Sequence, residues 1–195
     1  MKKIILASGS PRRRELLTQI GISFEVVKAE GEEKITTDDP EEAVKELAMQ
    51  KAQEVAGRVD ADVVIGADTV VAVDGEIMGK PKDPEDAVRT IRRIQGRDHE
   101  VLTGVAVILK KGEVETTINF AETTRVHVFP MTEEEIRAYV ASKEPMDKAG
   151  AYGIQGLFAA YVSGIEGDYN NVVGLPVGRL YQEVKAIADV DLRTL

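Results

Sequence analysis

The chain has 195 residues, of which 43% are hydrophobic and 30% are charged, and its formal net charge is -9. A chain of this length can bury the core of one α/β domain, so we expect a single domain over residues 1–195. The negative charge argues against a nucleic-acid partner, because such a surface repels a phosphate backbone. A phosphate ligand would therefore need a local basic pocket.

The sequence contains no cysteine and only two histidines, His99 and His127. A disulfide framework and a thiolate metal site are excluded, and the histidines are too far apart to form a helical ligand pair. Any metal ion would be held mainly by oxygen, which favours Mg²⁺ or Mn²⁺. The apolar stretch after Met1-Lys2-Lys3 is only about four residues long, short of a signal peptide or membrane span. We therefore expect a cytoplasmic protein with no membrane partner.

The N-terminal part of the chain predicts a strand–loop–helix unit. Residues 3–7 form a short apolar run, and Ser8-Gly9-Ser10 leads into a helix that begins at Pro11 and ends before Gly21. After a strand over 24–27, a second helix is expected over 39–57, because it begins with a capping residue, a proline and two acids.

The rest of the chain combines hairpins with helices. Apolar residues over 63–73, an Asp-Gly turn and residues 76–78 are typical of a hairpin. The further expected elements are an amphipathic helix over 84–94, long strands over 101–109 and 114–128, and helices over 132–142 and 176–188. Strands interleaved with helices and hairpins indicate an α/β fold with a mixed sheet covered by helices.

Three arginines, Arg12, Arg13 and Arg14, lie in the first turn of the helix that begins at Pro11. The positive end of the helix dipole disfavours cations, so this arrangement suggests an anion at that position. Free N–H groups at the helix start and guanidinium side chains both suit phosphate oxygens. The alternative is that the arginines simply extend into solvent.

Two further charged residues lie where apolar residues are expected. Lys51 follows Leu47 by four residues and lies on the core-facing stripe of its helix, so it either snorkels to solvent or enters a polar cleft. Asp68 interrupts the apolar run over 63–73, where a carboxylate needs a hydrogen bond, an opposite charge or a metal. Asp68 is a candidate acid, base or metal ligand, or a residue bonded to backbone N–H groups at a strand end.

One more cation, Lys80, follows the 76–78 hairpin. The segment from Gly75 to Pro81 is not a P-loop, because too few residues separate its glycines and Pro81 replaces the required Ser or Thr. Lys80 therefore remains a single available cation.

Several segments match one family pattern in the same order along the chain. They are residues 6–17, 48–52, 65–71, 79–81, 99–104, 147–156, 165–169 and 171–176. In these segments the sequence resembles the Maf-like nucleotide pyrophosphatases. The resemblance implies an elongated mixed sheet in two lobes around a cleft, related to the inosine triphosphate pyrophosphatases, and commonly a homodimer.

The resemblance also implies roles for individual residues. Asp68 matches the proton acceptor, and Glu33 matches a glutamate associated with the metal, which Asp68 would also hold. Lys51 and Lys80 are expected to take part in catalysis. The expected substrate-binding residues are Ser8, Ser10, Arg12, Arg13, Thr69 and Gln155.

The implied reaction is attack of water on the α-phosphorus of a nucleoside triphosphate, with pyrophosphate as leaving group. Residues 148–156 resemble the branch that acts on dTTP and UTP, and CTP is a further candidate. The Gln155 amide and Thr69 hydroxyl could pair with a pyrimidine edge. The alternatives are a nucleotide-binding regulator of cell division and a house-cleaning pyrophosphatase for modified nucleotides such as 7-methyl-GTP.

Overall fold

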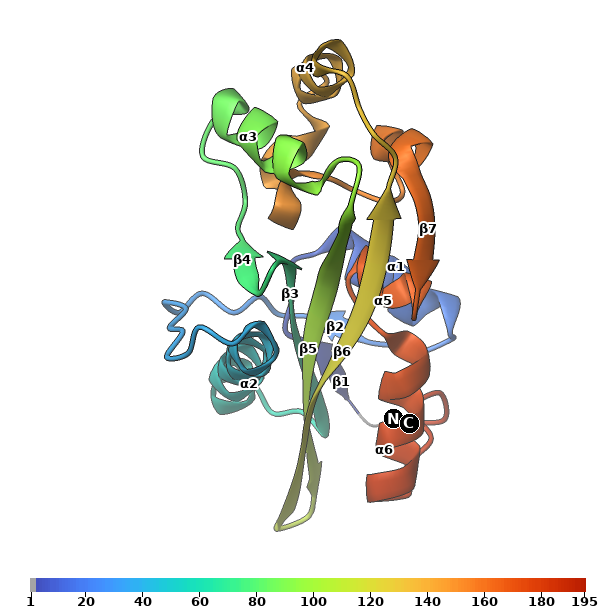
Figure 1. Ribbon diagram of the computed structural model, residues 1–195. Coiled ribbons are helices and arrows are strands. Elements are labelled where there is room, and N and C mark those ends of the chain that lie inside the picture. The colour runs from blue at the N-terminus through green and yellow to red at the C-terminus, as the bar shows by residue number, and fades with distance from the viewer. Residues whose placement is uncertain (1–2) are drawn as a thin grey trace.

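The structure of the protein is a computed structural model in which residues 3–195 are described, so Met1 and Lys2 at the start of the chain lie outside the described residues. A mixed sheet forms its centre (Figure 1). The strands lie in the order β2-β1-β3-β5-β6-β7, and β4 pairs with β3 separately. β1 (Ile4–Leu6) is parallel to β2 (Glu25–Val26) and to β3 (Val63–Val73), whereas the other pairs are antiparallel. The expected α/β class is confirmed.

The remaining strands are β4 (Glu76–Met78), β5 (Asp98–Lys111), β6 (Val114–Val128) and β7 (Val162–Glu166). β3, β5 and β6 are the long strands, and β5 begins three residues before the expected strand over 101–109. β7 was not predicted, because a half-exposed strand of five residues that contains Gly164 carries little pattern.

Most helices begin where their capping residues predict. The bounds are α1 (Pro11–Gln19), α2 (Pro40–Arg58), α3 (Pro84–Ile94), α4 (Glu133–Ala141), α5 (Tyr169–Val173) and α6 (Val177–Ala188). Asp39 accepts hydrogen bonds from two N–H groups of α2, and Thr132 forms a capping box with Glu135. The sequence did not predict α5 or the short 3-10 helices over 144–147, 149–151 and 157–161.

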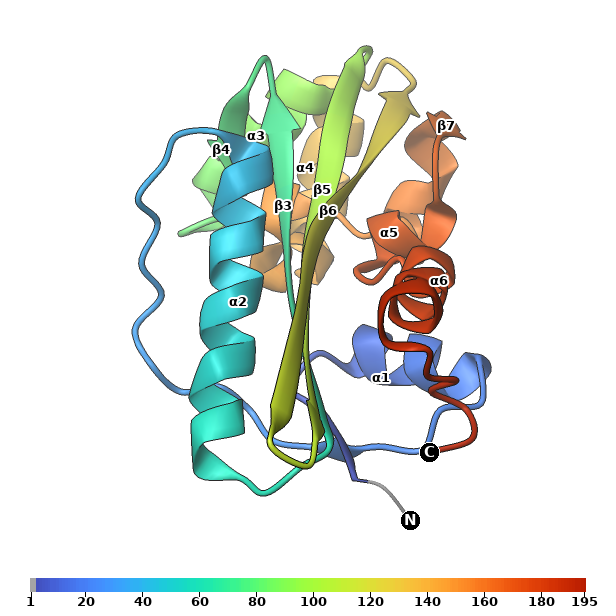
Figure 2. The same ribbon diagram turned by 90° about the horizontal axis from the view of Figure 1, so that it is seen from below.

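The helices form layers on both sides of the sheet. α2 covers one face, whereas α1, α5 and α6 lie on the other (Figure 2). One hydrophobic cluster joins α1, α6 and the sheet, and a second cluster joins α3, α4 and the opposite end of the long strands. These clusters form the cores of two lobes, as expected.

Along one edge of β3, the strand that pairs with it changes from β1 to β4. β1 pairs with residues 63–65, and β4 pairs with residues 71–73. β5 occupies the opposite edge, so residues 66–70 have no strand partner on the β1 and β4 side within the described chain. This interruption lies between the parts of β3 that contribute to the two hydrophobic clusters.

Two glycines allow α2 to approach the sheet closely. A Cβ atom on Gly66 would lie 2.3 Å from the carbonyl oxygen of Ala48, and one on Gly104 would lie 2.0 Å from that of Val44. Gly104 is the register partner of Asp68. The close packing therefore places α2 directly over Asp68.

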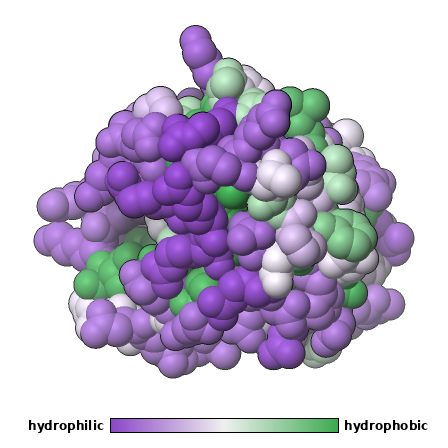
Figure 3. Space-filling view, turned by 45° about the horizontal axis from the view of Figure 1, so that its top comes forward, coloured by the Kyte–Doolittle hydropathy of each residue, from purple (hydrophilic) through white to green (hydrophobic). Residues whose placement is uncertain are grey.

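One face of the surface is mainly hydrophilic, with a few separate hydrophobic patches (Figure 3). Within residues 3–195, no helix combines the length and apolar character needed to cross a membrane.

Candidate active site

The loop Ser8-Gly9-Ser10 joins β1 to α1 beside the interrupted edge of β3. Ser10 caps α1, because its Oγ accepts a hydrogen bond from the Arg13 N–H group at 3.5 Å. The Ser10 N–H group donates to Ser8 Oγ at 3.3 Å. A loop between the carboxyl end of a parallel strand and a helix N-terminus is well suited to bind an anion.

Arg13 lies beneath this loop and is 9% exposed. Its guanidinium donates to the carbonyl oxygens of Gly174 (2.8 Å) and Ala67 (2.9 Å). It also donates to the hydroxyl oxygens of Ser8 (3.1 Å) and Thr69 (2.9 Å). Burial lowers the pKa of Arg13 below its ordinary value, although the charge of Asp68 opposes this shift. A guanidinium has five N–H groups, so these four bonds leave one for a phosphate.

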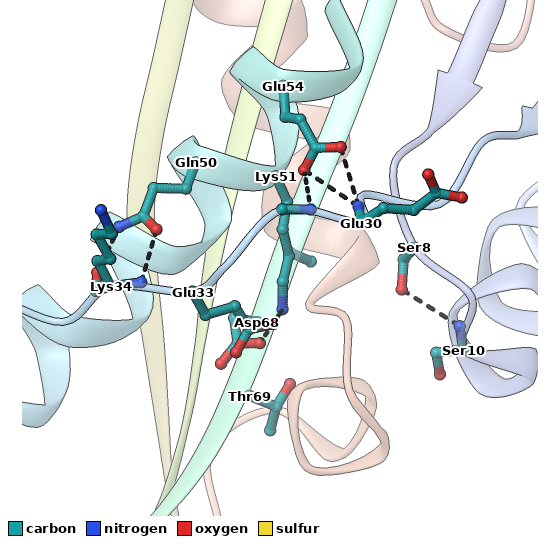
Figure 4. A network of polar contacts seen from close by, with 12 residues as sticks. Ser8, Ser10, Glu30, Glu33, Lys34, Gln50, Lys51, Glu54, Asp68 and Thr69 are labelled. Carbon is teal, nitrogen blue, oxygen red and sulfur yellow. Dashed lines mark hydrogen bonds and ion pairs between the residues drawn. The ribbon is translucent and has the colours of Figure 1, made fainter.

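Asp68 and Lys51 face each other across the contact between β3 and α2 and form an ion pair (Figure 4). Lys51 Nζ also lies 2.9 Å from Glu33 Oε1. The side chains of Asp68 and Lys51 are each 16% exposed, whereas that of Glu33 is 56% exposed. Lys51 therefore enters a polar site and does not snorkel past the core into open solvent.

Side chains of α2 hold the irregular loop that carries Glu33. They are spaced four residues apart, so they form one row along the helix. The contacts are those of Glu54 with the N–H groups of Glu30 and Gly31 (both 2.9 Å), of Gln50 with the N–H group of Lys34 (3.0 Å), and of Glu46 with the N–H group of Thr36 (2.9 Å). The loop consequently runs antiparallel to α2 and places Glu33 beside Lys51 (Figure 4).

A groove lies between this loop and α2. Its lining consists of Ala29, Gly31, Glu32, Glu33, Gln50, Lys51, Gln53 and Glu54. Lys51 is the only cation in this lining, so the groove presents carboxylates and amides around a single ammonium group. Two members of the Asp68–Lys51–Glu33 group, Lys51 and Glu33, thus line the groove.

Arg12 and Lys80 differ from the two engaged cations. Arg12 is half-buried and Lys80 is exposed. Within residues 3–195 neither side chain forms an ion pair, whereas Lys51 forms two. Lys80 follows Gly79, whose carbonyl oxygen accepts a hydrogen bond from the Gly150 N–H group at 3.2 Å. The side chains of Arg12 and Lys80 are free to bind an anion.

Thr69 and Gln155 occupy different environments. The hydroxyl of Thr69 lies 2.9 Å from that of Thr103 and accepts the Arg13 bond described above. Neighbouring side chains of a strand point to opposite faces, so Thr69 faces α1 while Asp68 faces α2. Gln155 is exposed. Ile154, next to it, packs against the cores of both lobes, so Gln155 lies near their junction.

The predicted site residues thus form three sets. Asp68, Lys51 and Glu33 are in direct contact. Ser8, Ser10, Arg13 and Thr69 form a connected hydrogen-bond network. Arg12, Lys80 and Gln155 belong to neither network in the described part of the chain.

A sequence model of the family described as "Maf-like protein" matches residues 3–187. The chain belongs to this family. The dTTP/UTP pyrophosphatase of Agathobacter rectalis is 52% identical to this Maf-like protein over 96% of this chain and 98% of its own length. The dTTP/UTP pyrophosphatase of Bacillus cereus (strain B4264) is 49% identical over 98% of both chains. The resemblance seen in the sequence is confirmed.

Among solved structures, the Staphylococcus aureus Ham1 protein is similar to this Maf-like protein with a TM-score of 0.47 and 17% sequence identity. The similarity covers 65% of this chain and 72% of that chain.

The carboxylates of this Maf-like protein fit an oxygen-bound metal that arrives with its ligand. Asp68 and Glu33 converge on one Nζ atom, so their oxygens lie near a common point. No three His, Asp or Glu side chains among residues 3–195 are grouped so that they could hold a metal by themselves. Mg²⁺ is usually bound through one or two carboxylates together with substrate phosphates and water. The donor set therefore fits Mg²⁺ or Mn²⁺ bound with a nucleotide.

The sequence did not reveal the residues that position the site. The row formed by Glu46, Gln50 and Glu54 is visible as a spacing of four, but the irregular loop that it holds has no pattern. The partners of Arg13 include the carbonyl oxygens of Ala67 and Gly174, and a carbonyl carries no signal in the sequence.

Proposed function

We propose that this Maf-like protein hydrolyses dTTP and UTP, with CTP as a further candidate, to the monophosphate and pyrophosphate. The Asp68–Lys51–Glu33 group beside the start of α1 carries the proposal. It combines a carboxylate that accepts a proton with a cation that attracts a triphosphate. Relatives named dTTP/UTP pyrophosphatase are about half identical over nearly the full chain, which supports the same substrates.

Binding of the triphosphate would use the N-terminus of α1 and the cations around it. Arg12 and Lys80 have no ion-pair partner within the described chain and can contact phosphate oxygens, while Ser8 and Ser10 offer hydroxyl groups. Arg13 would act mainly by holding the loop, with its one remaining N–H group available to the ligand. This assignment differs from the simpler expectation that Arg12 and Arg13 bind phosphate in the same way.

In the chemical step, Asp68 would accept the proton of a water molecule that attacks the α-phosphorus. The bond from the α-phosphorus to the bridging oxygen breaks, and pyrophosphate leaves. Lys51, which pairs with Asp68, would stabilise negative charge on the phosphates. A divalent metal held by Asp68 and Glu33 would neutralise phosphate charge and make water more acidic.

Base recognition would depend mainly on Gln155. The hydroxyl of Thr69 is already engaged with Arg13 and Thr103, whereas the exposed amide of Gln155 can both donate and accept. A pyrimidine edge offers alternating donors and acceptors. A base that leaves such groups unpaired is strongly disfavoured.

The test is to measure kcat/KM for dTTP, UTP, CTP, dGTP, GTP and 7-methyl-GTP with Mg²⁺ and with Mn²⁺, and to identify the products by chromatography. The Asp68→Asn variant, purified in parallel, controls for contaminating hydrolases. We expect monophosphate and pyrophosphate from dTTP and UTP. Release of orthophosphate alone would overturn the reaction, and preference for 7-methyl-GTP would overturn only the substrate. Tight binding without turnover would favour the nucleotide-binding regulator.

Three expectations from the sequence stay predictions: one domain over residues 1–195, a homodimer, which the resemblance implies, and a cytoplasmic location without nucleic-acid or membrane partners. Light scattering during size-exclusion chromatography measures the mass in solution, which for a dimer would be twice the 21.3 kDa of one chain.

A further inference from the structure

Gln155 lies in a turn whose two ends are fixed. The Gly156 N–H group donates to the Gly153 carbonyl oxygen at 3.1 Å, which closes a four-residue turn with Ile154 and Gln155 at its centre. Ile154 packs against both hydrophobic cores, whereas Gln155 is exposed. The turn therefore anchors one central residue and presents the other to solvent.

Glu144, in the 3-10 helix that follows α4, contacts the end of this turn. One carboxylate oxygen accepts a hydrogen bond from the Tyr139 hydroxyl at 3.0 Å, and the other accepts one from the Leu157 N–H group at 2.9 Å. The carbonyl oxygen of Glu144 accepts a hydrogen bond from Lys148 Nζ at 2.7 Å. The stem of Lys148 lies against Gly153, where an added Cβ atom would approach its Cε atom to 2.8 Å. Both ends of the turn thus rest on Glu144 and its partner Lys148.

The fit between Gly156 and Glu144 leaves no room for a side chain. A Cβ atom on Gly156 would lie 2.3 Å from Oε1 and 2.4 Å from Oε2 of Glu144. The φ of Gly156 is -102°, which any residue can adopt, so the carboxylate alone excludes a larger residue. The carboxylate could move away only by giving up the bonds to Tyr139 and Leu157.

We propose that Glu144 is a positioning residue for base recognition, because it fixes the turn that presents Gln155. The inference rests on the proposed function, in which Gln155 pairs with the base. Hydrogen-bond discrimination requires the amide to be held in place, and a displacement of about 1 Å strongly weakens such selection. Glu144 thereby sets the preference for a base without touching the substrate.

The test compares kcat and KM for dTTP and for dGTP in Glu144→Ala, Glu144→Gln and Gln155→Ala. Glu144→Ala should lower the ratio of the two kcat/KM values about tenfold or more, through the KM for dTTP. Glu144→Gln should keep most of the ratio, because its amide oxygen can still accept a bond from Leu157. Glu135→Ala is the matched control, since Glu135 accepts a bond from the Thr132 N–H group at 2.8 Å but lies at the start of α4. Glu135→Ala should leave the ratio of the two kcat/KM values unchanged.

A second variant tests the contact between Gly156 and the Glu144 carboxylate by changing the glycine. Gly156→Ala should lower the ratio by itself, because the new Cβ atom displaces the carboxylate of Glu144. In the Glu144→Ala background the same change should have little further effect, because the displaced oxygens are gone. The two substitutions are therefore expected to be strongly non-additive.

The possible results separate the two proposals. An equal loss for both nucleotides, with the ratio unchanged, would make Glu144 a general structural residue and overturn the inference. If Gln155→Ala lowers the ratio but the Glu144 and Gly156 variants do not, the inference fails while the proposed function stands. If Gln155→Ala leaves the ratio unchanged, base recognition by Gln155 fails and the inference fails with it. Thermal melting identifies unfolded protein, and if Glu144→Ala is unfolded, Gly156→Ala and Glu144→Gln decide the question.

Discussion

Lys51 and Arg13 lie on opposite sides of β3 and hold their positive charges in different ways. Lys51 contacts two carboxylates, those of Asp68 and Glu33, and lines a groove. Arg13 is almost fully buried and donates to four neutral oxygens on β3, the Ser8 loop and the segment between α5 and α6. One cation has charged partners near solvent, and the other has neutral partners inside the protein.

This difference indicates which cation can change partners. Phosphate or a metal ion can compete for charged groups that reach solvent, so the contacts of Lys51 can rearrange when a ligand binds. The contacts of Arg13 are backbone and hydroxyl groups that join three segments, and losing them would leave buried acceptors without donors. We therefore propose that Lys51 belongs to the reacting part of the site and Arg13 to its scaffold.

The largest effect is expected from Asp68→Asn. The amide keeps the shape of the side chain but accepts no proton and carries no charge for a metal. Turnover should fall more than about 10²-fold, while nucleotide binding persists. Steady-state kinetics and calorimetric titration with dTTP measure the two quantities. A kcat close to that of the unmodified protein would show that Asp68 has a structural role.

The next prediction compares Arg13→Met with Lys51→Met. Both should reduce activity, but Arg13→Met should lower the free energy of unfolding by at least about 2 kcal/mol, because it leaves buried oxygens unpaired. Lys51→Met should cost less, because water can reach Asp68 and Glu33. Urea unfolding of the two variants measures the difference. Equal losses of stability would remove the distinction between scaffold and reacting cation.

The sequence predicted the contacts of Lys51 better than those of Arg13. Lys51 and Asp68 each break a local pattern, so their positions suggested a polar contact, and the structure brings them together. Arg13 also breaks a pattern, but a helix-start arginine is expected to reach outward to an anion. Its inward direction depends on the carbonyl of Gly174, which is far away in sequence.

The secondary-structure elements were likewise predictable only where the signal is local in the sequence. Helices with capping residues were predicted to within about one residue, because each carries its signal locally, whereas the strand expected over 101–109 is longer at both ends in β5. β7 (Val162–Glu166) and α5 (Tyr169–Val173) are each five residues long, too short for a clear period. β7 is also specified by its pairing with β6, which includes an irregularity between His127 and Val128.

A smaller effect is expected from the row of α2 side chains that supports Glu33. Gln50→Ala removes two bonds to the Lys34 backbone, one accepted from its N–H group and one donated to its carbonyl oxygen, so the loop that carries Glu33 is held less firmly. The KM for the nucleotide should rise at least about threefold to tenfold at low Mg²⁺, because the net contribution of each hydrogen bond is of that size. Gln53→Ala, which alters the same groove without touching the loop, is the control. No change in KM for Gln50→Ala would show that the loop positions Glu33 by itself.

The smallest effects are expected on the free energy of unfolding when either histidine is replaced. Like Lys51 and Arg13, one histidine has charged partners and the other has a neutral one. His127 lies between Asp98 (2.6 Å) and Glu166 (3.2 Å). The hydrogen bond to Asp98 raises its pKa above 6.5. His99 is buried, and its Nε2 lies 2.7 Å from the Tyr152 hydroxyl. Burial lowers the pKa of His99 to about 4.

These shifts predict opposite dependences of stability on pH. The contribution of His127 is present in full below the unfolded pKa of 6.5 and is lost as pH rises through the higher folded pKa. The contribution of His99 is present above 6.5 and is lost as pH falls toward the folded pKa of about 4. The free energy of unfolding of His127→Gln and His99→Gln, measured between about pH 5.5 and 8, covers the range in which histidine titrates. The deficit of His127→Gln relative to the unmodified protein should be larger at the acidic end, and that of His99→Gln at the basic end. If both deficits change with pH in the same direction, the charged partners of His127 and the buried, neutral surroundings of His99 do not affect stability in opposite ways, and the contrast drawn between Lys51 and Arg13 does not extend to the histidines.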